Sequence, residues 1–401
     1  MRILLISQYY YPERTPSFIV AEELQKLGHE VTVLTGKPNY GFKEPLEEYK
    51  NVSFEIINGV KLHRVNASFR KKGILSLIKN YLSFSRLASK FLRKLKPNYD
   101  LVLGINLSPI TSLKGASKYV KKHHLPFAIY VLDLWPESVV ATGITKRNSL
   151  FYNFLFKYSR NIYKSADGFL YSSPSFDDYM KNVIGVNHPS KLVYQPLNTS
   201  SFKDISSPFK EGEKPLVYCG NLGRLQDLSP LIKAFSKLEK DSKLSLHIIG
   251  DGALRNKLEE ESKKHYLEDK VIFYGFMEAS EAYRYSKNAY ANVVKLETTD
   301  SPVSKTIPTK LIYSLYLGRP ILSLIGDDGR NLLKEAGGAF FPMEDEDSLI
   351  KELTKIENLS VNEISLMGKK NQEYYLEHLS TNKTMLIFES FLRDLYSQRN
   401  S

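Results

Sequence analysis

The chain has little cysteine and no long apolar run. Its 401 residues include one cysteine, Cys219, which excludes an internal disulfide framework and a zinc site built from several thiolates of one chain. We therefore expect a reducing, cytoplasmic compartment. No stretch of about eighteen uncharged apolar residues occurs, so the sequence predicts no transmembrane helix, and any membrane contact is expected to be peripheral. The short run Ile3–Ile6 is interrupted at Gln8, too early for the core of a secretory signal, and predicts a strand.

Sequence patterns of two other functional classes are missing. No strand leads into G-x-G-x-x-G with an acidic residue about twenty positions later, the arrangement that binds a dinucleotide, which argues against a dehydrogenase. No zinc-finger, helix-turn-helix or RNP-type pattern accompanies the net charge of +12, so nucleic acid is not an expected partner. No acidic cluster of the kind that holds a metal is visible either.

The positive charge is concentrated in residues 61–125, which hold 15 lysines and arginines but one acid, Asp100. Residues 73–95 place apolar side chains at helical spacing with basic residues between them, which predicts a basic amphipathic helix. One interpretation is attachment to anionic lipid headgroups, and the other is a core-facing helix with a solvated basic face. The predicted apolar stripe consists of Ile74, Leu77, Ile78, Leu82, Leu87, Phe91 and Leu95. The basic residues on and before the helix are Arg70, Lys71, Lys72, Lys79, Arg86, Lys90, Arg93 and Lys94.

Short apolar runs alternate with helical patterns along the whole chain. The length and a composition of 42% hydrophobic and 25% charged residues are typical of a globular protein with two domains. The alternation predicts an α/β fold with doubly wound parallel sheets, and a turn-rich stretch at 198–215 separates the halves. We predict one Rossmann-like domain in residues 1–197, a second in 198–380, and a helix in 381–401 that packs back on the body. Such sheets bind ligands beyond the carboxyl ends of their strands, so two domains facing each other are expected to form one cleft.

Two glycine-rich turns follow strands of the second domain. The first is Gly220-Asn221-Leu222-Gly223-Arg224, and the second is Gly250-Asp251-Gly252. Glycines let the backbone approach a bound group, and Asn221 or Arg224 can reach a phosphate. Either turn alone is often only structural, but the pair in one domain is typical of a nucleotide site.

A third motif, Pro308-Thr309-Lys310, opens a predicted helix that Gly318-Arg319-Pro320 closes. Proline is preset for a first helical turn, and the free N–H groups of that turn together with the helix dipole favour a diphosphate. Lys310 would add a mobile cation. The alternative is an ordinary capped helix with a solvated lysine.

The first domain offers two carboxylates after one strand. Asp133 closes the predicted strand Phe127–Leu132 and is expected at the cleft, where it can accept a hydroxyl proton or orient a substrate, and Glu137 lies one turn further on. The alternative for Asp133 is a helix cap, and for Trp135 it is core packing. At least one of the three tyrosines in Tyr9–Tyr11 is expected to line the cleft.

These motifs resemble those of retaining type-B glycosyltransferases of bacterial polysaccharide clusters, especially the N-acetyl-fucosamine transferases of O-antigen and capsule synthesis. The resemblance spans nearly the whole chain, and the motifs of both halves occur in the order that the family uses. The most specific string is Asp133-Leu134-Trp135-Pro136-Glu137-Ser138. Further matching strings in the first half are Ile6–Glu13, Leu27–Thr35 and Pro38-Asn39-Tyr40.

The resemblance implies the two-domain GT-B fold, a UDP-linked sugar donor bound by the second domain and a lipid-linked saccharide acceptor, on a polyprenyl diphosphate, bound by the first. It also implies retention of anomeric configuration, no metal, and peripheral attachment to the inner face of the plasma membrane through residues 61–125. The catalytic candidates are Asp133, Glu137, Lys310 and Arg224. The donor-binding candidates are Gly220, Asn221, Gly223, Gly250, Asp251, Gly252, Pro308, Thr309 and Tyr313.

The chain departs from the family pattern at several positions. Many relatives have glutamates where this chain has Lys305 and Tyr313, so we expect the donor ribose to be held by backbone together with Glu297 or Glu335. Arg14-Thr15-Pro16-Ser17 stands where many relatives have glycines, which alters the acceptor-side loop. Two alternatives stay open: a nucleotide-sugar 2-epimerase of the same architecture, and a membrane-bound assembly subunit that has lost donor binding.

Overall fold

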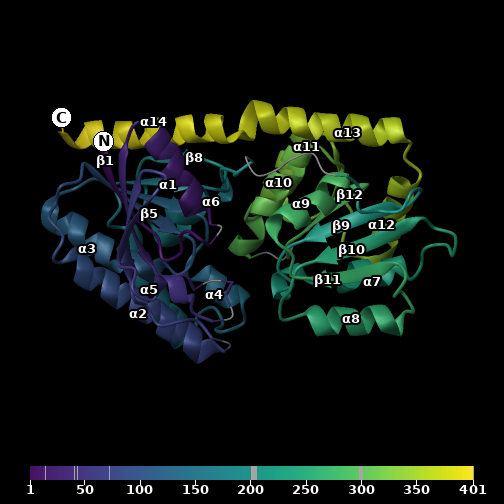
Figure 1. Ribbon diagram of the computed structural model, residues 1–401, viewed down its shortest axis with the longest axis horizontal. Coiled ribbons are helices and arrows are strands. Elements are labelled where there is room, and N and C mark those ends of the chain that lie inside the picture. The colour runs from purple at the N-terminus through teal and green to yellow at the C-terminus, as the bar shows by residue number, and fades with distance from the viewer. Residues whose placement is uncertain are drawn as a thin grey trace. The chain divides into compact units, whose positions relative to one another are not determined.

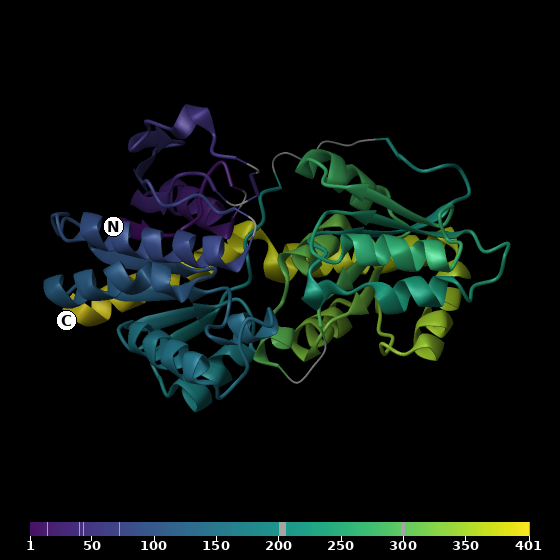
Figure 2. The ribbon, with the colours of Figure 1, turned by 90° about the horizontal axis from the view of Figure 1, so that it is seen from below.

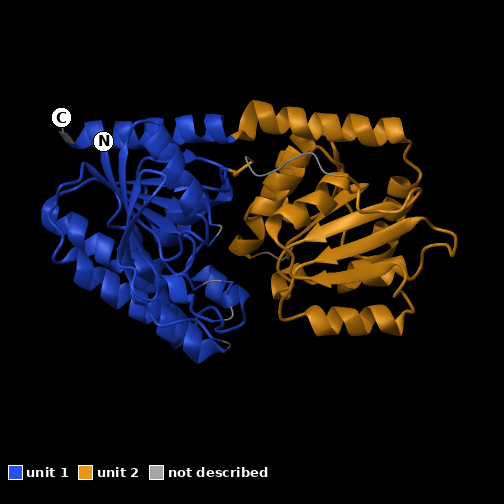
Figure 3. Ribbon diagram, in the orientation of Figure 1, with its two compact units in different colours: residues 1–196, 381–401 blue, residues 197–380 orange. Residues whose placement is uncertain are grey.

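The computed structural model describes residues 1–13, 15–39, 41–42, 44–71, 73–199, 206–297 and 301–400. The chain divides into two compact units (Figure 3): unit 1 is Met1–Pro196 with Thr381–Ser401, and unit 2 is Leu197–Ser380. The first junction lies one residue before the predicted one, and the last segment joins unit 1. The predicted linker 198–215 includes residues 200–205, which lie outside the described residues.

Unit 1 contains a mostly parallel sheet with helices on both faces (Figure 1). Its strands are β1 (Arg2–Ile6), β2 (Glu30–Gly36), β3 (Phe54–Ile57), β4 (Val60–Val65), β5 (Leu101–Asn106), β6 (Phe127–Val131), β7 (Gly168–Tyr171) and β8 (Ser190–Leu192). Its α-helices are α1 (Pro16–Lys26), α2 (Ile74–Leu92), α3 (Lys114–His123), α4 (Glu137–Ala141), α5 (Leu150–Tyr163), α6 (Ser175–Tyr179) and α14 (Thr381–Asn400). Shorter helical turns are η1 (Glu47–Tyr49), η2 (Ile110–Leu113) and the π-helical η3 (Met180–Ile184).

The strand order of unit 1 is β3-β4-β2-β1-β5-β6-β7-β8. All described pairs are parallel except β3–β4, where the two-residue turn after Ile57 returns the chain antiparallel at the sheet edge. The central strands are buried on both faces, and the apolar residues of β1 and β5 accordingly form continuous runs rather than an alternating pattern. One face packs against α2, α3 and α5, and the other against α1 and α14.

Helix α14 belongs to unit 1 although unit 2 precedes it in the chain. Its residues Met385, Phe388 and Leu392 are at most 1% exposed and pack with strands β1, β2 and β5. Phe388 meets the ring of Tyr130 on β6 edge to face, with centroids 5.1 Å apart. These contacts make the C-terminal helix part of the first core.

Helix α2 buries a different face from the predicted apolar stripe. The side that meets the sheet consists of Asn80, Phe84, Ser85, Ala88 and Leu92. Three members of the predicted stripe are instead exposed, since Ile74, Ile78 and Leu82 have 44%, 39% and 59% of their surface accessible. The helix carries apolar residues on two sides, and periodicity alone cannot say which side a sheet will cover. Figure 2 shows α2 and α3 lying next to each other on the unit 1 sheet.

Unit 2 repeats the same architecture. Its strands are β9 (Lys214–Cys219), β10 (Leu244–Ile249), β11 (Val271–Gly275), β12 (Ala291–Lys295), β13 (Ile321–Leu324) and β14 (Ala339–Phe340). Its α-helices are α7 (Ser229–Phe235), α8 (Arg255–Lys264), α9 (Ala279–Asn288), α10 (Thr309–Leu317), α11 (Asp327–Ala336), α12 (Glu346–Glu357) and α13 (Val361–Tyr374). Shorter helical turns are η4 (Arg224–Gln226), η5 (Pro302–Lys305) and the π-helical η6 (Tyr375–Leu379).

The strands of unit 2 are all parallel, in the order β11-β10-β9-β12-β13-β14. Helices α7, α8 and α12 cover one face with a core centred on Leu231, Phe235 and Leu353, while α9, α10 and α11 lie on the other face (Figure 1). The predicted fold class, two Rossmann-like α/β domains, is confirmed.

Candidate functional site

The crossover point of the unit 2 sheet lies between β9 and β12. From β9 the chain builds outward through β10 to β11 on one side, and then returns through β12 to β13 and β14 on the other. The loops that follow β9 and β12 therefore diverge at the carboxyl edge of the sheet, and such a divergence is where open α/β sheets bind ligands. Both glycine turns and the Pro-Thr-Lys motif adjoin this point.

The two glycine turns pack directly against each other. Gly220 N donates to Ile249 O at 2.9 Å, and Leu222 N donates to Asp251 O at 2.9 Å. A Cβ atom added to Gly250 would lie 1.9 Å from the carbonyl oxygen of Gly220, and both glycines have positive φ, at 138° and 152°. Glycine at position 250 is thus required by the contact between the turns, whereas the sequence suggested that it admits a ligand.

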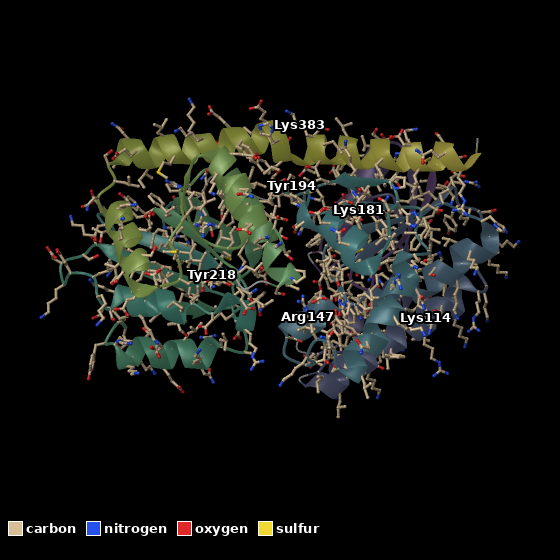
Figure 4. All side chains as sticks on the ribbon, turned by 180° about the vertical axis from the view of Figure 1, so that it is seen from behind. Lys114, Arg147, Lys181, Tyr194, Tyr218 and Lys383 are labelled. Atoms are coloured by element: carbon tan, nitrogen blue, oxygen red, sulfur yellow. The ribbon has the colours of Figure 1, made fainter. Side chains whose placement is uncertain are left out.

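Lys310 lies against the first turn. Its Nζ donates to the hydroxyl of Tyr218 at 2.8 Å and sits 4.3 Å from the centre of that ring, and the hydroxyl in turn donates to Asn221 O at 2.6 Å. A Cβ at Gly220 would come within 2.7 Å of the ammonium. Figure 4 marks Tyr218 on the sheet of unit 2. Burial lowers the pKa of Lys310 to about 8, because the ammonium has lost much of its water and pairs with no carboxylate among the described residues.

Helix α10 starts beside this lysine. Pro308 is the N-cap, with φ −74° and ψ 146°, and Thr309 is the first helical residue, so the proline stands one position before the predicted place. The helix ends at Gly318 in the left-handed conformation, as the sequence predicts. Ile307 is buried and anchors the approach to the helix. The backbone N–H groups of the first turn and the Lys310 ammonium thus occupy one place at the carboxyl edge.

A cavity of about 320 Å³ adjoins the loops after β9 and β12. It is lined by Arg224, Leu225, Asp227, Pro230, Lys295, Glu297 and Glu344. Lys295 ends β12, is 5% exposed and pairs with Glu344 at 2.6 Å, and Asp227 pairs with Lys257 at 2.8 Å. Arg224 opens η4 and is exposed, with no ion-pair or hydrogen-bond partner among the residues that the structure describes.

The other donor-side candidates are placed as follows. Asn221 is exposed, and its amide donates to the side chain of Gln226 at 3.3 Å. The Asp251 carboxylate accepts from Gly252 N at 2.7 Å and so stabilises its own turn. Tyr313 is half-buried in the second turn of α10. Of the two glutamates expected at the ribose, Glu297 lines the cavity, whereas Glu335 on α11 is exposed and accepts from Tyr374 at 2.7 Å.

Asp133 follows β6 at the carboxyl edge of the unit 1 sheet. Asn106, at the end of β5, donates to the Asp133 carbonyl oxygen at 2.8 Å. Trp135 is 6% exposed, and its indole N–H donates to the hydroxyl of Ser108 at 2.7 Å, so the tryptophan is a packing residue. Burial raises the pKa of Asp133 to about 7, and this effect outweighs the opposite influence of Ser108 and of the Leu134 backbone N–H. A carboxyl group with this pKa is suited to proton transfer near neutral pH.

Glu137 is enclosed by donors. Its side chain is 2% exposed and accepts from Arg147 at 2.7 and 2.9 Å, from the Tyr152 hydroxyl at 2.7 Å and from the Tyr179 hydroxyl at 3.1 Å. These contacts join α4 to α5 and α6, and Figure 4 marks Arg147 in unit 1. They indicate that Glu137 positions the loop after Asp133. A direct catalytic role for Glu137 stays a prediction.

Among the three tyrosines near β1, Tyr11 is 38% exposed, whereas Tyr9 and Tyr10 are buried at 4% and 1%. Tyr11 is therefore the one available to a ligand. The Arg14, Tyr40 and Lys72 positions named from the sequence lie outside the described residues.

Comparison with known families identifies both halves of the chain. A model described as "Glycosyltransferase Family 4" matches residues 18–201, and one described as "Glycosyl transferases group 1" matches residues 200–382. Together the two matches run from residue 18 to residue 382. The chain is a GT-B glycosyltransferase.

Individual relatives agree with this assignment. The "Probable glycosyltransferase WbjE" of Pseudomonas aeruginosa is 27% identical over 292 residues, which are 68% of this chain and 69% of the relative. The solved sucrose-phosphate synthase of Thermosynechococcus elongatus superposes with a TM-score of 0.77 at 16% identity, covering 99% of this chain and 100% of the other. HepE of Anabaena, solved with UDP, gives 0.71 at 14% identity, with 98% and 100% covered. At these identities the two solved structures establish the fold.

Sequence reasoning about the glycosyltransferase missed several residues of the unit 2 site. The sequence predicted no binding role for Tyr218, Lys295 or Glu344. Lys295 could have been found from its position, because it is the last residue of a buried strand and must emerge at the carboxyl edge. Glu344 gave no comparable signal, since it lies in the connection after the last strand.

None of the described helices of the glycosyltransferase is both long and apolar enough to cross a membrane. No group of three or more histidine, cysteine, aspartate or glutamate side chains among the described residues is arranged to hold a metal ion. Metal independence stays a prediction.

Proposed function

We propose that this glycosyltransferase moves a sugar from a UDP-sugar to a saccharide on a polyprenyl diphosphate, at the cytoplasmic face of the plasma membrane. The transferred sugar is an N-acetylated deoxyhexosamine such as N-acetyl-fucosamine, and the product serves capsule or O-antigen synthesis. The reaction retains anomeric configuration and uses no metal. The sugar, the acceptor, the pathway and the stereochemistry rest on the resemblance described from the sequence.

The observation that supports donor binding is Lys310 at the start of α10, which is half-buried and pairs with no carboxylate in the part of the chain that the structure describes. The bond between the anomeric carbon and the diphosphate oxygen breaks while the acceptor hydroxyl oxygen bonds to that carbon, so negative charge grows on the leaving UDP. Lys310 and Arg224 supply positive charge that stabilises the leaving diphosphate. The N-terminal end of α10 adds the positive end of its helix dipole. The Tyr218 hydroxyl holds Lys310 before the reaction, so little reorganisation of this cation is needed.

Asp133 is the proposed base that takes the proton from the acceptor hydroxyl. The acceptor hydroxyl must lose its proton as the new glycosidic bond forms. A carboxyl group with a pKa of about 7 is ionised in a substantial fraction of molecules near neutral pH and holds a proton well once it receives one. The Glu137 contacts with Arg147, Tyr152 and Tyr179 fix the loop that carries this group.

Membrane attachment is supported by exposed apolar residues on two helices of unit 1. We call the six residues Leu75, Ile78, Leu82, Leu150, Phe151 and Phe154 the outer apolar surface. Their exposed fractions run from 39% at Ile78 to 90% at Leu150. A solvated face would not favour such side chains, whereas the interface of a bilayer does.

The two helices that carry this surface begin at the same edge of the sheet as Asp133. Helix α2 joins β4 to β5 and α5 joins β6 to β7, and all these strands are parallel, so both helices begin at the carboxyl edge of the sheet. Tyr158 of α5 lies against Ser85 of α2, which keeps the helices close. The outer apolar surface occupies the first three turns of α2 and the first two turns of α5, and exposed basic residues follow on both helices, including Arg86, Lys90 and Lys157. In this arrangement the apolar residues would contact the acyl chains, and the basic residues that follow would contact the anionic headgroups.

Transfer is tested with purified protein, a panel of nucleotide sugars and a polyprenyl-diphosphate saccharide. We expect UDP release only when a donor and the acceptor are both present, with an α-configured donor giving an α-linked product by NMR. Isomerisation of the donor without acceptor would instead establish the 2-epimerase. A protein that binds no nucleotide sugar in calorimetry would be the assembly subunit.

Membrane attachment is tested by co-sedimentation with vesicles. Replacing both Leu82 and Phe154 with serine is expected to weaken binding to phosphatidylglycerol vesicles at least tenfold, because each inserted side chain contributes about 1.5–3 kcal/mol. Replacing the 74% exposed Phe276 of unit 2 with serine is the matched control and should change nothing. Equal binding by all three proteins would exclude insertion through this surface.

A further inference from the structure

The cavity in unit 2 contains two opposite charges that do not pair. Of its charged lining residues, Lys295 and Glu344 bind each other, and Asp227 binds Lys257 and Ser229. Arg224 and Glu297 have neither an ion pair nor a side-chain hydrogen bond with any residue that the structure describes. The Glu297 backbone is fixed, because its N–H donates to Leu225 O at 2.7 Å, one residue beyond Arg224.

The cavity therefore has hydrogen-bond donors without a partner at Arg224 and acceptors without a partner at Glu297, among the described residues. The guanidinium has only donors, and the carboxylate has only acceptors. A ligand that satisfies both must carry anionic oxygens at one end and hydroxyl donors at the other. A sugar ring joined to a phosphate has this chemistry. The cavity volume of about 320 Å³ is at the lower end of small-molecule sites, which suits one ring and its phosphate rather than a whole nucleotide sugar.

We propose that Glu297 is a specificity residue that accepts hydrogen bonds from the hydroxyls of a phosphate-linked ring of the donor, while Arg224 binds the adjoining phosphate. This inference rests on the proposed function and adds a residue to it. The ring is either the ribose or the transferred sugar, and both present neighbouring hydroxyls next to a phosphate. Glu297 thereby replaces the carboxylate that is absent at Tyr313.

The position of Glu297 supports this assignment over the other glutamates. It follows β12 by two residues, at the crossover point of the sheet, where the Lys310 end of α10 also lies. Glu344 is bound to the nearly buried Lys295, and Glu335 is bound to Tyr374 on another helix. Glu297 is therefore the cavity-lining glutamate whose carboxylate is available to a ligand.

The test is calorimetric titration of the full-length wild type, Glu297→Gln and the control Glu335→Gln with UDP, 2′-deoxy-UDP and the accepted UDP-sugar. Glutamine keeps the size of the side chain and one acceptor oxygen but removes the charge. We expect Glu297→Gln to weaken binding by roughly tenfold, since a charge-assisted hydrogen bond becomes a neutral one. Glu335→Gln should bind like the wild type, and both variants should unfold at the wild-type temperature.

The ligands distinguish the two rings. If Glu297 holds the ribose, the variant weakens UDP and the UDP-sugar alike, and removing the 2′-hydroxyl costs the wild type affinity but costs the variant nothing more. If Glu297 holds the transferred sugar, only the UDP-sugar binds more weakly. Either pattern supports the inference. Unchanged affinity for all three ligands in a stable Glu297→Gln protein would overturn it, whereas a wild type that binds none of them would overturn the proposed function as well.

Discussion

Binding of UDP is expected to drive proton uptake by Lys310. In the free protein burial lowers the pKa of this lysine to about 8 from an ordinary 10.5. A diphosphate beside the ammonium is an opposite charge, which favours the protonated form and raises the pKa again. The amine must therefore gain a proton from the buffer whenever UDP binds above the free-state pKa.

The size of the effect follows from that pKa. At pH 8.5 a group with a pKa of about 8 is protonated in about one quarter of the molecules, so binding that restores a pKa near 10 takes up about 0.7 proton. At pH 7 the free amine is already about nine-tenths protonated, and the uptake falls to about 0.1 proton. The phosphate of UDP does not interfere at pH 8.5, because its second pKa is near 6.

The assay is calorimetry at pH 8.5 in two buffers with different ionisation enthalpies, and the difference in apparent binding heat counts the protons. Lys310→Met is the control, since methionine fills similar space and cannot titrate. We expect it to bind UDP at least tenfold more weakly and with no uptake beyond experimental error. A wild type that takes up no proton at pH 8.5, or a variant that takes up as much, would refute the assignment of Lys310 to the diphosphate.

Three further predictions concern other parts of the molecule. Gly250→Ala should cost about 3 kcal/mol or more of unfolding free energy in urea, because its Cβ would lie 1.9 Å from Gly220 O. The control Gly212→Ala also has positive φ but no atom within 4 Å of the added Cβ, so it should cost about 1–2 kcal/mol. Equal losses in the two variants would contradict the clash. The pKa of Asp133 is raised to about 7 from 3.8, so ionisation of this carboxyl group is disfavoured in the folded state. The Asp133→Asn variant should therefore match the wild type in stability near pH 4, exceed it by about 1–2 kcal/mol above pH 7, and lose transfer activity. A stability difference that stays constant across that pH range would exclude the raised pKa. Transfer should continue at its full rate in excess EDTA, and a loss restored by added Mg²⁺ would show that a metal is required.

The strand and helix pattern made most of the fold predictable. The predicted strand Phe127–Leu132 begins in the structure at Phe127 and ends one residue early, at Val131, and the run Ile3–Ile6 lies in β1. Both strands are buried on both faces, and such burial favours an unbroken apolar run that the sequence shows directly. Helix α2 was predicted in place but with the wrong face inward, since its apolar residues lie on two sides. The short strands β8 and β14 were not predicted, because two or three residues carry no readable period.

The candidate site was also only partly predictable from the sequence. Asp133, Arg224 and Lys310 could be named from the sequence because each follows a strand or opens a helix, and the carboxyl edge of a parallel sheet gathers such positions. Their individual roles required the structure. Glu137 looked like a second acid, and only its contacts with Arg147, Tyr152 and Tyr179 indicate a positioning role.

The sequence by itself determined that the chain has two doubly wound domains, where their strands lie and which motifs adjoin the carboxyl edges, since hydrophobic periodicity and turn chemistry are local properties. Only the tertiary structure decided that Gly250 faces Gly220, that Lys310 rests on Tyr218, and that Arg224 and Glu297 line one cavity without pairing. Each of these facts joins residues separated by thirty or more positions in the chain. No local pattern encodes which side chains such a meeting leaves without a partner.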